Sequence, residues 1–384
     1  MSWEGNLPGL YVHVPFCRKK CAYCDFYSVT VLAAIPAFVQ ALRVEMQLRS
    51  RDIPGPFGSL YIGGGTPSVL PGETLATIVH HARNHFTILN DAEITVEANP
   101  ESMTPAWLEA VRGAGANRLN IGVQSFDDTM LAFLGRLHTA AQARQAVDMA
   151  RGAGFDNIGL DLIYGIPGQT PDHIHRDLDF ALAMAPAHLA CYMLTYEDDT
   201  PLTLAMERGD HRPPSESLTA GLFRLVSDVL IRAGFVHYEI SNFAWTPAHM
   251  ATHNAKYWRR VPYTGFGPAA HSYTGRQRSW NVRDIDRYIE TLTRRRRPLA
   301  AKETLTREQH MLEAVYLGLR TAAGIEIATF NKEFTENFER LFAPVVSDLQ
   351  SRNLLVIADG RCFLTADGMQ FHEAVATRFY NECL

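Results

Sequence analysis

The chain has 384 residues, of which 47% are hydrophobic and 20% are charged, and its formal net charge is -5. This length has room for one barrel-sized domain and a smaller second domain. The small net charge gives no field that would favour nucleic acid as a partner, and no apolar stretch approaches the ~20 residues that cross a bilayer. We therefore expect a cytoplasmic protein. The one basic run, residues 294–297, leaves peripheral membrane contact open, although a solvated helix end is the simpler interpretation.

Short β-type runs alternate with helical patterns through the first half of the chain. This alternation is typical of parallel strands joined by right-handed crossovers. Six strands are expected, at residues 10–14, 59–62, 93–97, 118–122, 157–162 and 188–194. Helices are expected between them, at residues 35–51, 71–85, 105–113, 127–134, 140–152 and 171–184. We therefore predict an α/β fold with a partial (β/α)6 TIM-like barrel.

Three of the six cysteines, Cys17, Cys21 and Cys24, follow the first expected strand in a C-x3-C-x2-C arrangement. Lys19 and Lys20 keep this loop positive, which favours thiolates. A cubane iron-sulfur cluster held by three sulfurs has one iron without a protein ligand. That iron is a binding position for a small ligand.

A zinc site is the alternative interpretation of this loop, because Asp25 or His13 could supply a fourth ligand. Structural zinc sites commonly contain a second C-x2-C pair, which this chain lacks. A disulfide framework is less favoured, because Cys191, Cys362 and Cys383 are scattered and no signal peptide precedes them. We therefore expect free cytosolic thiols.

Polar or glycine-rich segments follow the other expected strands, at the carboxyl ends where barrel proteins carry their sites. Glycines 63–65 follow the second strand, and a carboxylate lies within the otherwise apolar fifth strand, where it is costly unless it is paired or liganded. Each polar residue of this kind could be purely structural, but together they indicate a ring of hydrogen-bonding groups around one ligand. The side chains in this ring are Glu97, Gln124, Arg136 and Asp161, and Thr66 adds a hydroxyl to the glycine-rich segment.

The cysteine loop, with Tyr11, His13 and the aromatic residues around Cys24, resembles the cluster loop of radical S-adenosylmethionine (SAM) proteins. The order of C-x3-C-x2-C, G-G-G-T-P-S, V-E-A-N-P, G-V-Q-S-F and D-L-I-Y-G-I-P-G-Q-T resembles oxygen-independent coproporphyrinogen III oxidases and the related HemW-type heme chaperones. This resemblance covers nearly the whole chain. It implies a [4Fe-4S] cluster on Cys17, Cys21 and Cys24, with SAM at the open iron. It also implies a first SAM site with Tyr11, Gly64 and Glu97, and a second with Tyr23, Gly65, Thr66, Gln124, Arg136 and Asp161.

Two departures from the oxidases favour the chaperones. Only sixteen residues precede Cys17, where the oxidases have a long extension, and Phe26 occupies the position of a further oxidase cysteine. We therefore expect a protein that binds heme and transfers it to an acceptor protein, and we assign no catalytic residue. The alternative is an oxidase of porphyrin biosynthesis, in which a 5'-deoxyadenosyl radical abstracts a propionate hydrogen. A zinc-stabilised binding module is a third alternative.

Residues 253–258, H-N-A-K-Y-W, match the H-N-x-x-Y-W element of the HemW-type proteins. His253 is the candidate ligand of the heme iron, and Tyr257 and Trp258 are aromatic residues that could border a macrocycle. The sequence identifies neither the acceptor nor an electron donor, and it leaves a homodimer open.

The chain is expected to divide into a barrel at residues 1–240, a connecting segment with the heme motif at 241–298, and a HemN-like C-terminal domain at 299–384. Segments 238–244 and 265–272 are interpreted as loops that pack over the barrel mouth. The last domain is expected to contain helices at 307–320, 325–334 and 342–352, a hairpin at 354–364 and a helix at 366–382. This order resembles a winged-helix module. No basic recognition face is evident, so a lid or docking role is favoured over DNA binding.

Overall fold

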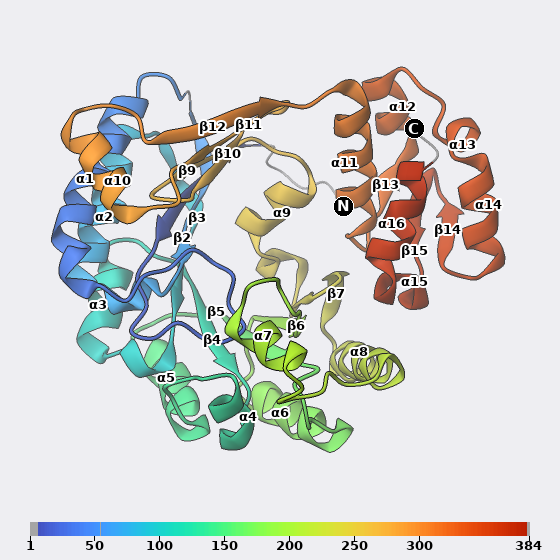
Figure 1. The fold of residues 1–384 in the computed structure, drawn as a ribbon, viewed down its shortest axis with the longest axis horizontal. Coiled ribbons are helices and arrows are strands. Elements are labelled where there is room, and N and C mark those ends of the chain that lie inside the picture. The colour runs from blue at the N-terminus through green and yellow to red at the C-terminus, as the bar shows by residue number, and fades with distance from the viewer. Residues whose placement is uncertain (1–6, 54, 382–384) are drawn as a thin grey trace.

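The computed structural model describes residues 7–53 and 55–381 of the chain, and its centre is a parallel sheet (Figure 1). Six strands pair side by side in chain order and in parallel. They are β1 (Gly9–Val14), β2 (Phe57–Gly64), β3 (Ile88–Ala98), β4 (Arg118–Gln124), β5 (Asn157–Tyr164) and β6 (His188–Met193). The six expected strands and the partial barrel are therefore confirmed.

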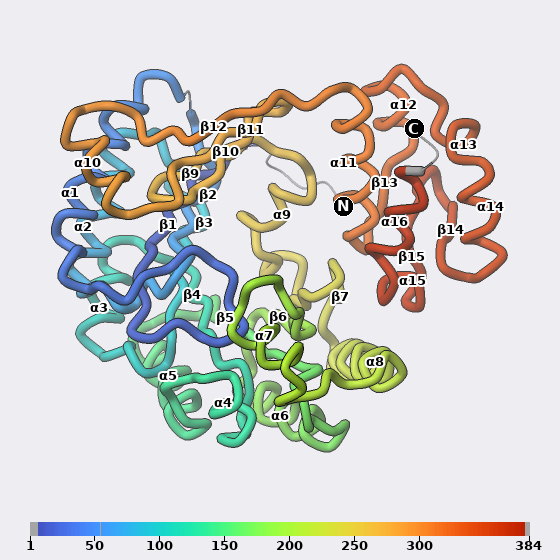
Figure 2. Tube along the Cα trace, in the orientation of Figure 1, coloured from blue at the N-terminus to red at the C-terminus, as the bar shows by residue number. Residues whose placement is uncertain are grey.

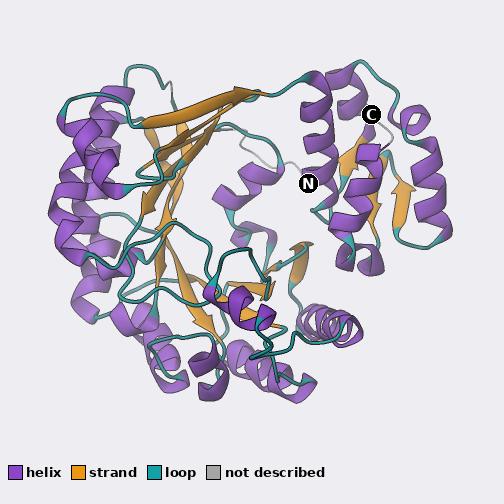
Figure 3. Ribbon diagram, in the orientation of Figure 1, coloured by secondary structure: helices purple, strands orange, loops and turns teal. Residues whose placement is uncertain are grey.

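The helices that connect these strands cover the outer face of the sheet (Figure 3). Local sequence explains where several begin: Thr104 caps α3, Asp127 caps α4, and Thr139 forms a capping box with Gln142 in α5. All six expected helices are present, with ends that differ by at most two residues. Their bounds are α1 (Ile35–Arg49), α2 (Gly72–His85), α3 (Pro105–Gly113), α4 (Asp128–Phe133), α5 (Ala140–Gly152) and α6 (Pro171–Ala183).

The sheet continues beyond the barrel strands on both sides, and here the sequence-based prediction was wrong. Segments 238–244 and 265–272 were expected to be loops, but most of their residues belong to strands. β7 (Val236–Glu239) and β8 (Asn242–Ala244) extend the sheet beyond β6. β9 (Tyr263–Phe266) pairs in parallel with β1, and β10 (His271–Tyr273), β11 (Gln277–Asn281) and β12 (Leu299–Thr304) follow it. These strands have three to six residues, so pairing with a distant edge defines them rather than local alternation.

A buried carboxylate ties this extension to the barrel. Glu45 of α1 is fully buried and accepts hydrogen bonds from Gly267 N (2.9 Å), Asn281 Nδ2 (2.8 Å) and the Tyr288 hydroxyl (2.7 Å). Arg49, one turn further along α1, pairs with Glu45 at 2.9 Å. The carboxylate thereby joins α1 to the segment after β9, to β11 and to α10 (Ile285–Thr293).

Three further helices lie between β6 and β9 in the chain: α7 (Pro201–Glu207), α8 (Glu216–Arg232) and α9 (Thr252–Trp258). Helix α9 lies between the barrel and the C-terminal domain and contacts both β2 and α11 (Figure 2). Within the described ranges, no helix is both long and apolar enough to span a membrane.

The C-terminal domain contains a three-stranded sheet in the order β13-β15-β14 with helices around it, and the winged-helix-like prediction is confirmed. The expected final helix 366–382 is wrong in one respect: its backbone leaves the helical conformation at Phe371 (φ -111, ψ 22), which divides it into two helices. Glu382 and Cys383 lie outside the described residues. The elements are α11 (Arg307–Leu319), β13 (Ile325–Glu326), α12 (Ile327–Phe334), α13 (Phe338–Leu341), α14 (Ala343–Ser351), β14 (Leu355–Ala358), β15 (Arg361–Leu364), α15 (Ala366–Gln370) and α16 (His372–Asn381).

Candidate functional site

A cavity of ≈ 710 Å³ lies at the carboxyl ends of the barrel strands and continues into the barrel interior. It brings together most of the side chains that the sequence pointed to. Tyr11 and His253 are the two predicted site residues that do not line it. Those that do are Cys17, Cys21, Tyr23, Cys24, Gly64, Gly65, Thr66, Glu97, Gln124, Arg136 and Asp161.

The three cysteines of the loop after β1 reach this one cavity. Cys17 is anchored beside the barrel by its backbone N–H, which donates to Val29 O at 3.0 Å, and its sulfur accepts from Thr66 Oγ1 at 3.4 Å. Cys24 N donates to Cys21 O at 3.3 Å, and Arg136 Nη1 lies 3.8 Å from Cys21 Sγ. Three sulfur donors lie beside a guanidinium, and the cavity has room for a further ligand. This arrangement fits a cluster with an open iron.

The same donors fit a single zinc ion poorly. In the part of the chain that the structure describes, no three His, Cys, Asp or Glu side chains are close enough together to hold one metal ion. Four sulfurs around zinc lie about 3.8 Å apart, given a Zn–S bond of about 2.3 Å, whereas the cysteines of a cubane bind different irons and lie further apart. The proposed fourth ligands are engaged elsewhere: His13 contacts the Tyr11 hydroxyl and Tyr27 O, and exposed Asp25 pairs with Arg283.

Burial raises the pKa of both the Cys17 and the Cys24 thiols above the usual value. Lys20 lowers the pKa of Cys24, but this effect is smaller than that of burial. Lys20 therefore favours the Cys24 thiolate as expected, but burial dominates and the net pKa of both thiols is raised. The two thiols become good ligands when a metal displaces their protons.

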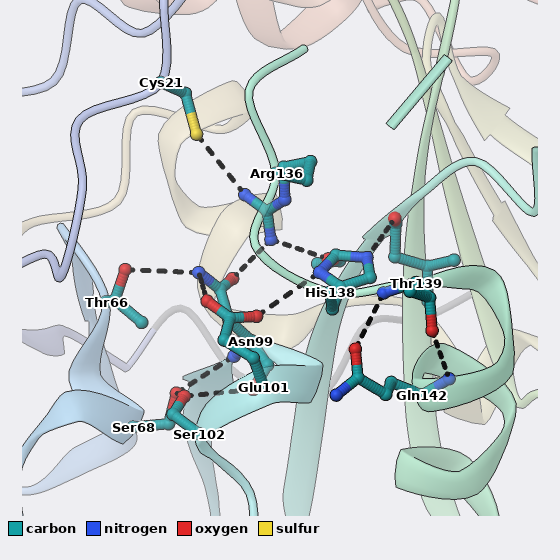
Figure 4. A network of polar contacts seen from close by, with 12 residues as sticks. Cys21, Thr66, Ser68, Asn99, Glu101, Ser102, Arg136, His138, Thr139 and Gln142 are labelled. Carbon is teal, nitrogen blue, oxygen red and sulfur yellow. Dashed lines mark hydrogen bonds and ion pairs between the residues drawn. The ribbon is translucent and has the colours of Figure 1, made fainter. Parts of the chain in front are cut away.

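Asn99 connects the cluster loop to the glycine-rich segment and to Arg136 (Figure 4). Its side-chain Nδ2 donates to Thr66 Oγ1 at 3.3 Å, and its Oδ1 accepts from Arg136 Nη2 at 2.8 Å. Arg136 Nη2 also donates to Gly122 O at 2.9 Å. These bonds hold the guanidinium in one orientation, and its Nε remains buried without a partner.

Glu97, at the end of β3, accepts hydrogen bonds from the Tyr61 hydroxyl (2.5 Å) and from Gly64 N (3.2 Å). Burial nevertheless raises the pKa of the Glu97 carboxyl. Gly64 has a φ of +112, and a Cβ at this position would lie 2.5 Å from His13 Nδ1, so only glycine fits. Tyr11 does not line the cavity; its hydroxyl lies 2.9 Å from His13 Nδ1.

Asp161 of β5 presents an unsatisfied acceptor to the cavity. Asn120 Nδ2 donates to its Oδ2 at 2.7 Å, but its buried Oδ1 has no hydrogen-bond partner among the residues that the structure describes. Burial is the main reason why the pKa of Asp161 rises from 3.8 to about 7. Gln124 nearby has a φ of 72, a sparsely populated conformation for a residue other than glycine that is often found at functional sites. Both features fit a ligand that completes the site.

The wild-type protein is expected to lose stability as the pH rises, because Asp161 must then ionise while buried. Replacement of Asp161 by asparagine should remove this loss. The pKa of about 7 in the folded protein exceeds the value of 3.8, so the folded state keeps a proton that the unfolded chain releases between these values. The protonated Asp161 carboxyl stabilises the folded state fully below pH ~4, and this contribution is lost as the pH rises through ~7. At pH ~8 the Asp161→Asn protein should be more stable by on the order of 2–4 kcal/mol. Urea unfolding of both metal-free proteins at several pH values measures this difference. A difference that does not change with pH would contradict the assignment.

His253, the candidate heme ligand, is fully buried, and both of its ring nitrogens are occupied. Nδ1 lies 2.8 Å from Ser59 Oγ and Nε2 lies 3.0 Å from the Tyr257 hydroxyl. Burial lowers the pKa of His253 to about 3, so the ring is neutral. Ligation of an iron by His253 requires this side chain to leave both partners, and it stays a prediction.

Several side chains that line the cavity or support its lining residues were not predicted from the sequence. Tyr61 and Asn120 each lie two or more residues before a predicted motif on the same strand, facing the same side, so alternation along β2 and β4 was the available signal. Asn99 lies inside the V-E-A-N-P motif, but nothing in that motif indicates its bond to Arg136. Arg118 and His188 are further examples.

Comparison with known proteins defines the class of this chain. Residues 11–181 match the model of the radical SAM superfamily, and residues 305–371 match that of the HemN C-terminal domain. Coproporphyrinogen III oxidase HemN from Escherichia coli, a radical SAM enzyme, has a similar solved structure, with a TM-score of 0.83, 23% sequence identity and coverage of 97% of this chain and 90% of that chain. The fold and the matched domains are those of a radical SAM protein.

The sequence relatives are more specific. The heme chaperone HemW of Mycobacterium tuberculosis is 36% identical over 93% of this chain and 93% of its own length. The heme chaperone HemW of Bacillus subtilis is 33% identical over 97% of this chain and 99% of its own length. The chain belongs to the HemW family of radical SAM proteins, and the resemblance seen in the sequence is confirmed.

Proposed function

We propose that this protein is a heme chaperone that binds heme and transfers it to an acceptor protein. The observation that carries the proposal is the single cavity lined by three cysteine thiols and by polar side chains from β2 to β5, in a chain of the HemW family. Cys17, Cys21 and Cys24 hold a [4Fe-4S] cluster in this proposal. When bound, such a cluster supplies an open iron for SAM and a centre that accepts or donates an electron.

The residues around the cysteines have separate tasks in this proposal. Gly64 and Glu97 belong to the first SAM site, where Gly64 N donates to the Glu97 carboxylate and the carboxylate can also accept hydrogen bonds from the polar groups of a ligand. Arg136, held by Asn99, presents its positive charge to the cluster sulfurs through Cys21. Gln124 and Asp161 belong to a second ligand site, for which the free Oδ1 of Asp161 is an acceptor. We also propose a cytoplasmic location, with an acceptor and an electron donor as protein partners.

Titration with heme tests this function. The wild-type protein should give a Soret shift that saturates at one heme per chain, and His253→Ala should lose about tenfold or more in affinity, because an iron–imidazole bond must outweigh two hydrogen bonds of about 1 kcal/mol each. His249→Ala is the matched control, since His249 lies four residues away and its side chain forms a hydrogen bond with Thr246.

Two outcomes of these measurements would count against the proposal. Equal heme affinity of His253→Ala and wild type would remove His253 as the ligand. The absence of any Soret shift, together with formation of protoporphyrinogen from coproporphyrinogen III in the presence of SAM and a reductant, would favour an oxidase instead.

A further inference from the structure

The deep end of the cavity contains a buried arginine that lacks an anionic partner. Arg118, at the start of β4, is 2% exposed and lines the cavity beneath the cluster loop. Its Nη1 donates to Asn157 Oδ1 at 2.9 Å and to His249 O at 3.0 Å, and both acceptors are neutral. Among the described residues, no carboxylate lies within ion-pair distance of its guanidinium. Buried arginines are rare unless they are paired.

A second unsatisfied donor lies beside this arginine. His188 of β6 is 2% exposed and lines the same cavity, and its Nδ1 is buried without a partner. Its Nε2 lies 2.8 Å from the Tyr238 hydroxyl, which accepts from Ala251 N at 3.3 Å. Among the described residues, the hydroxyl hydrogen of Tyr238 has one acceptor in hydrogen-bonding contact, His188 Nε2. The proton of the neutral His188 ring is therefore on Nδ1, where it is free to donate.

The two donors converge on the space over Gly159. The position that a Cβ on Gly159 would occupy is 3.4 Å from His188 Nδ1 and 3.5 Å from Arg118 Nη2. Asn120 Oδ1 borders the same point at 2.6 Å, while the Nδ2 of that amide is already given to Asp161. The absence of a side chain at Gly159 leaves both donors open to the cavity.

Asp161 does not satisfy this cation. The positive charge of Arg118 lowers the pKa of Asp161, but burial outweighs it and keeps that pKa near 7, so much of this carboxyl is protonated at neutral pH. Asp161 Oδ2 accepts from Asn120 Nδ2, and among the described residues the guanidinium of Arg118 has no carboxylate within ion-pair distance.

We propose that the deep end of the cavity binds a carboxylate of the ligand between Arg118 and His188. A guanidinium and an imidazole N–H are both donors, which suits a carboxylate and would repel a cation. This inference rests on the proposed function, under which the carboxylate is a propionate of heme. The same two donors could bind the carboxylate of the methionine part of a SAM molecule. The test therefore distinguishes a heme propionate from the SAM carboxylate.

Reconstituted wild-type protein and the Arg118→Met variant are titrated with heme and with heme dimethyl ester, in which both propionates are masked. The wild type should bind heme about ten- to hundredfold more tightly than the ester, and Arg118→Met should bind both with similar affinity. Arg283→Met is the matched control, because it removes an arginine that is exposed and paired with Asp25 outside this end of the cavity. It should discriminate as the wild type does.

The second pair of ligands is SAM and decarboxylated SAM. If the carboxylate belongs to SAM, Arg118→Met loses affinity for SAM alone, and the discrimination between heme and its ester is unchanged. Undiminished discrimination in both pairs would overturn the inference. If the wild type binds no heme, the proposed function fails. The comparison of SAM with decarboxylated SAM then still tests whether Arg118 binds a carboxylate. Should Arg118→Met not fold, His188→Phe decides: reduced discrimination supports the carboxylate site, and wild-type discrimination overturns it.

Discussion

Replacement of Cys17 or Cys24 by alanine is expected to abolish cluster assembly. Each thiol supplies one of the three proposed iron ligands, and no other cysteine lines the cavity among the described residues. With two sulfurs, a cubane would have two irons without protein ligands, which leaves it exposed to loss of iron. Anaerobic reconstitution with iron and sulfide, followed by metal analysis and absorbance, measures the effect.

Cys362→Ala is the matched control for this experiment. Cys362 is fully buried in β15 of the C-terminal domain, away from the cavity, and it is a free thiol like the others. It should assemble the cluster as the wild type does. Full cluster assembly in Cys17→Ala, or an equal loss in Cys362→Ala, would contradict the assignment of the ligands.

Replacement of Glu45 by alanine is expected to lower the free energy of unfolding by about 3–5 kcal/mol, because it leaves Arg49 without its carboxylate partner inside the protein. Asn281, Gly267 N and the Tyr288 hydroxyl lose their acceptor at the same time. These groups lie on the segment that holds β9 to β11 against β1, so the change should also loosen that edge of the sheet. Chemical denaturation measures the loss, and hydrogen exchange locates it.

Glu290→Ala provides the comparison for Glu45→Ala. Glu290 is also a helical glutamate paired with an arginine four residues away, but the Glu290 and Arg294 side chains are 59% and 60% exposed. Removal of such a pair should change the free energy of unfolding by about 0.5 kcal/mol or less. Similar losses in the two variants would show that the buried network does not hold the extension.

The sequence was sufficient for the parts of the fold that local pattern determines. The barrel strands are short β-type runs that alternate with helical patterns, and the helices carry caps such as Thr139 and Asp127, so both could be located within a few residues. The cysteines and Thr66 follow these strands, and Glu97 lies near the end of one of them, at positions that a parallel sheet brings to one edge. Asp161 was identified as a carboxylate within an otherwise apolar strand.

The remaining features depend on contacts that the sequence does not display. β8 and β9 are strands because the edges of β6 and β1 accept them, and neither segment has its own alternating pattern. The bond between Asn99 and Arg136 joins residues 37 positions apart. The motif predicts that His253 is available as a ligand, but in the structure its ring is buried and forms hydrogen bonds with Ser59 and Tyr257.

The most direct test of the central claim is the electron paramagnetic resonance spectrum of the reduced, reconstituted protein before and after addition of SAM. Three cysteine ligands leave one iron open, so the account predicts a cubane signal that SAM changes by binding at that iron. A signal that SAM leaves unchanged, or a protein that assembles no cubane, would contradict it.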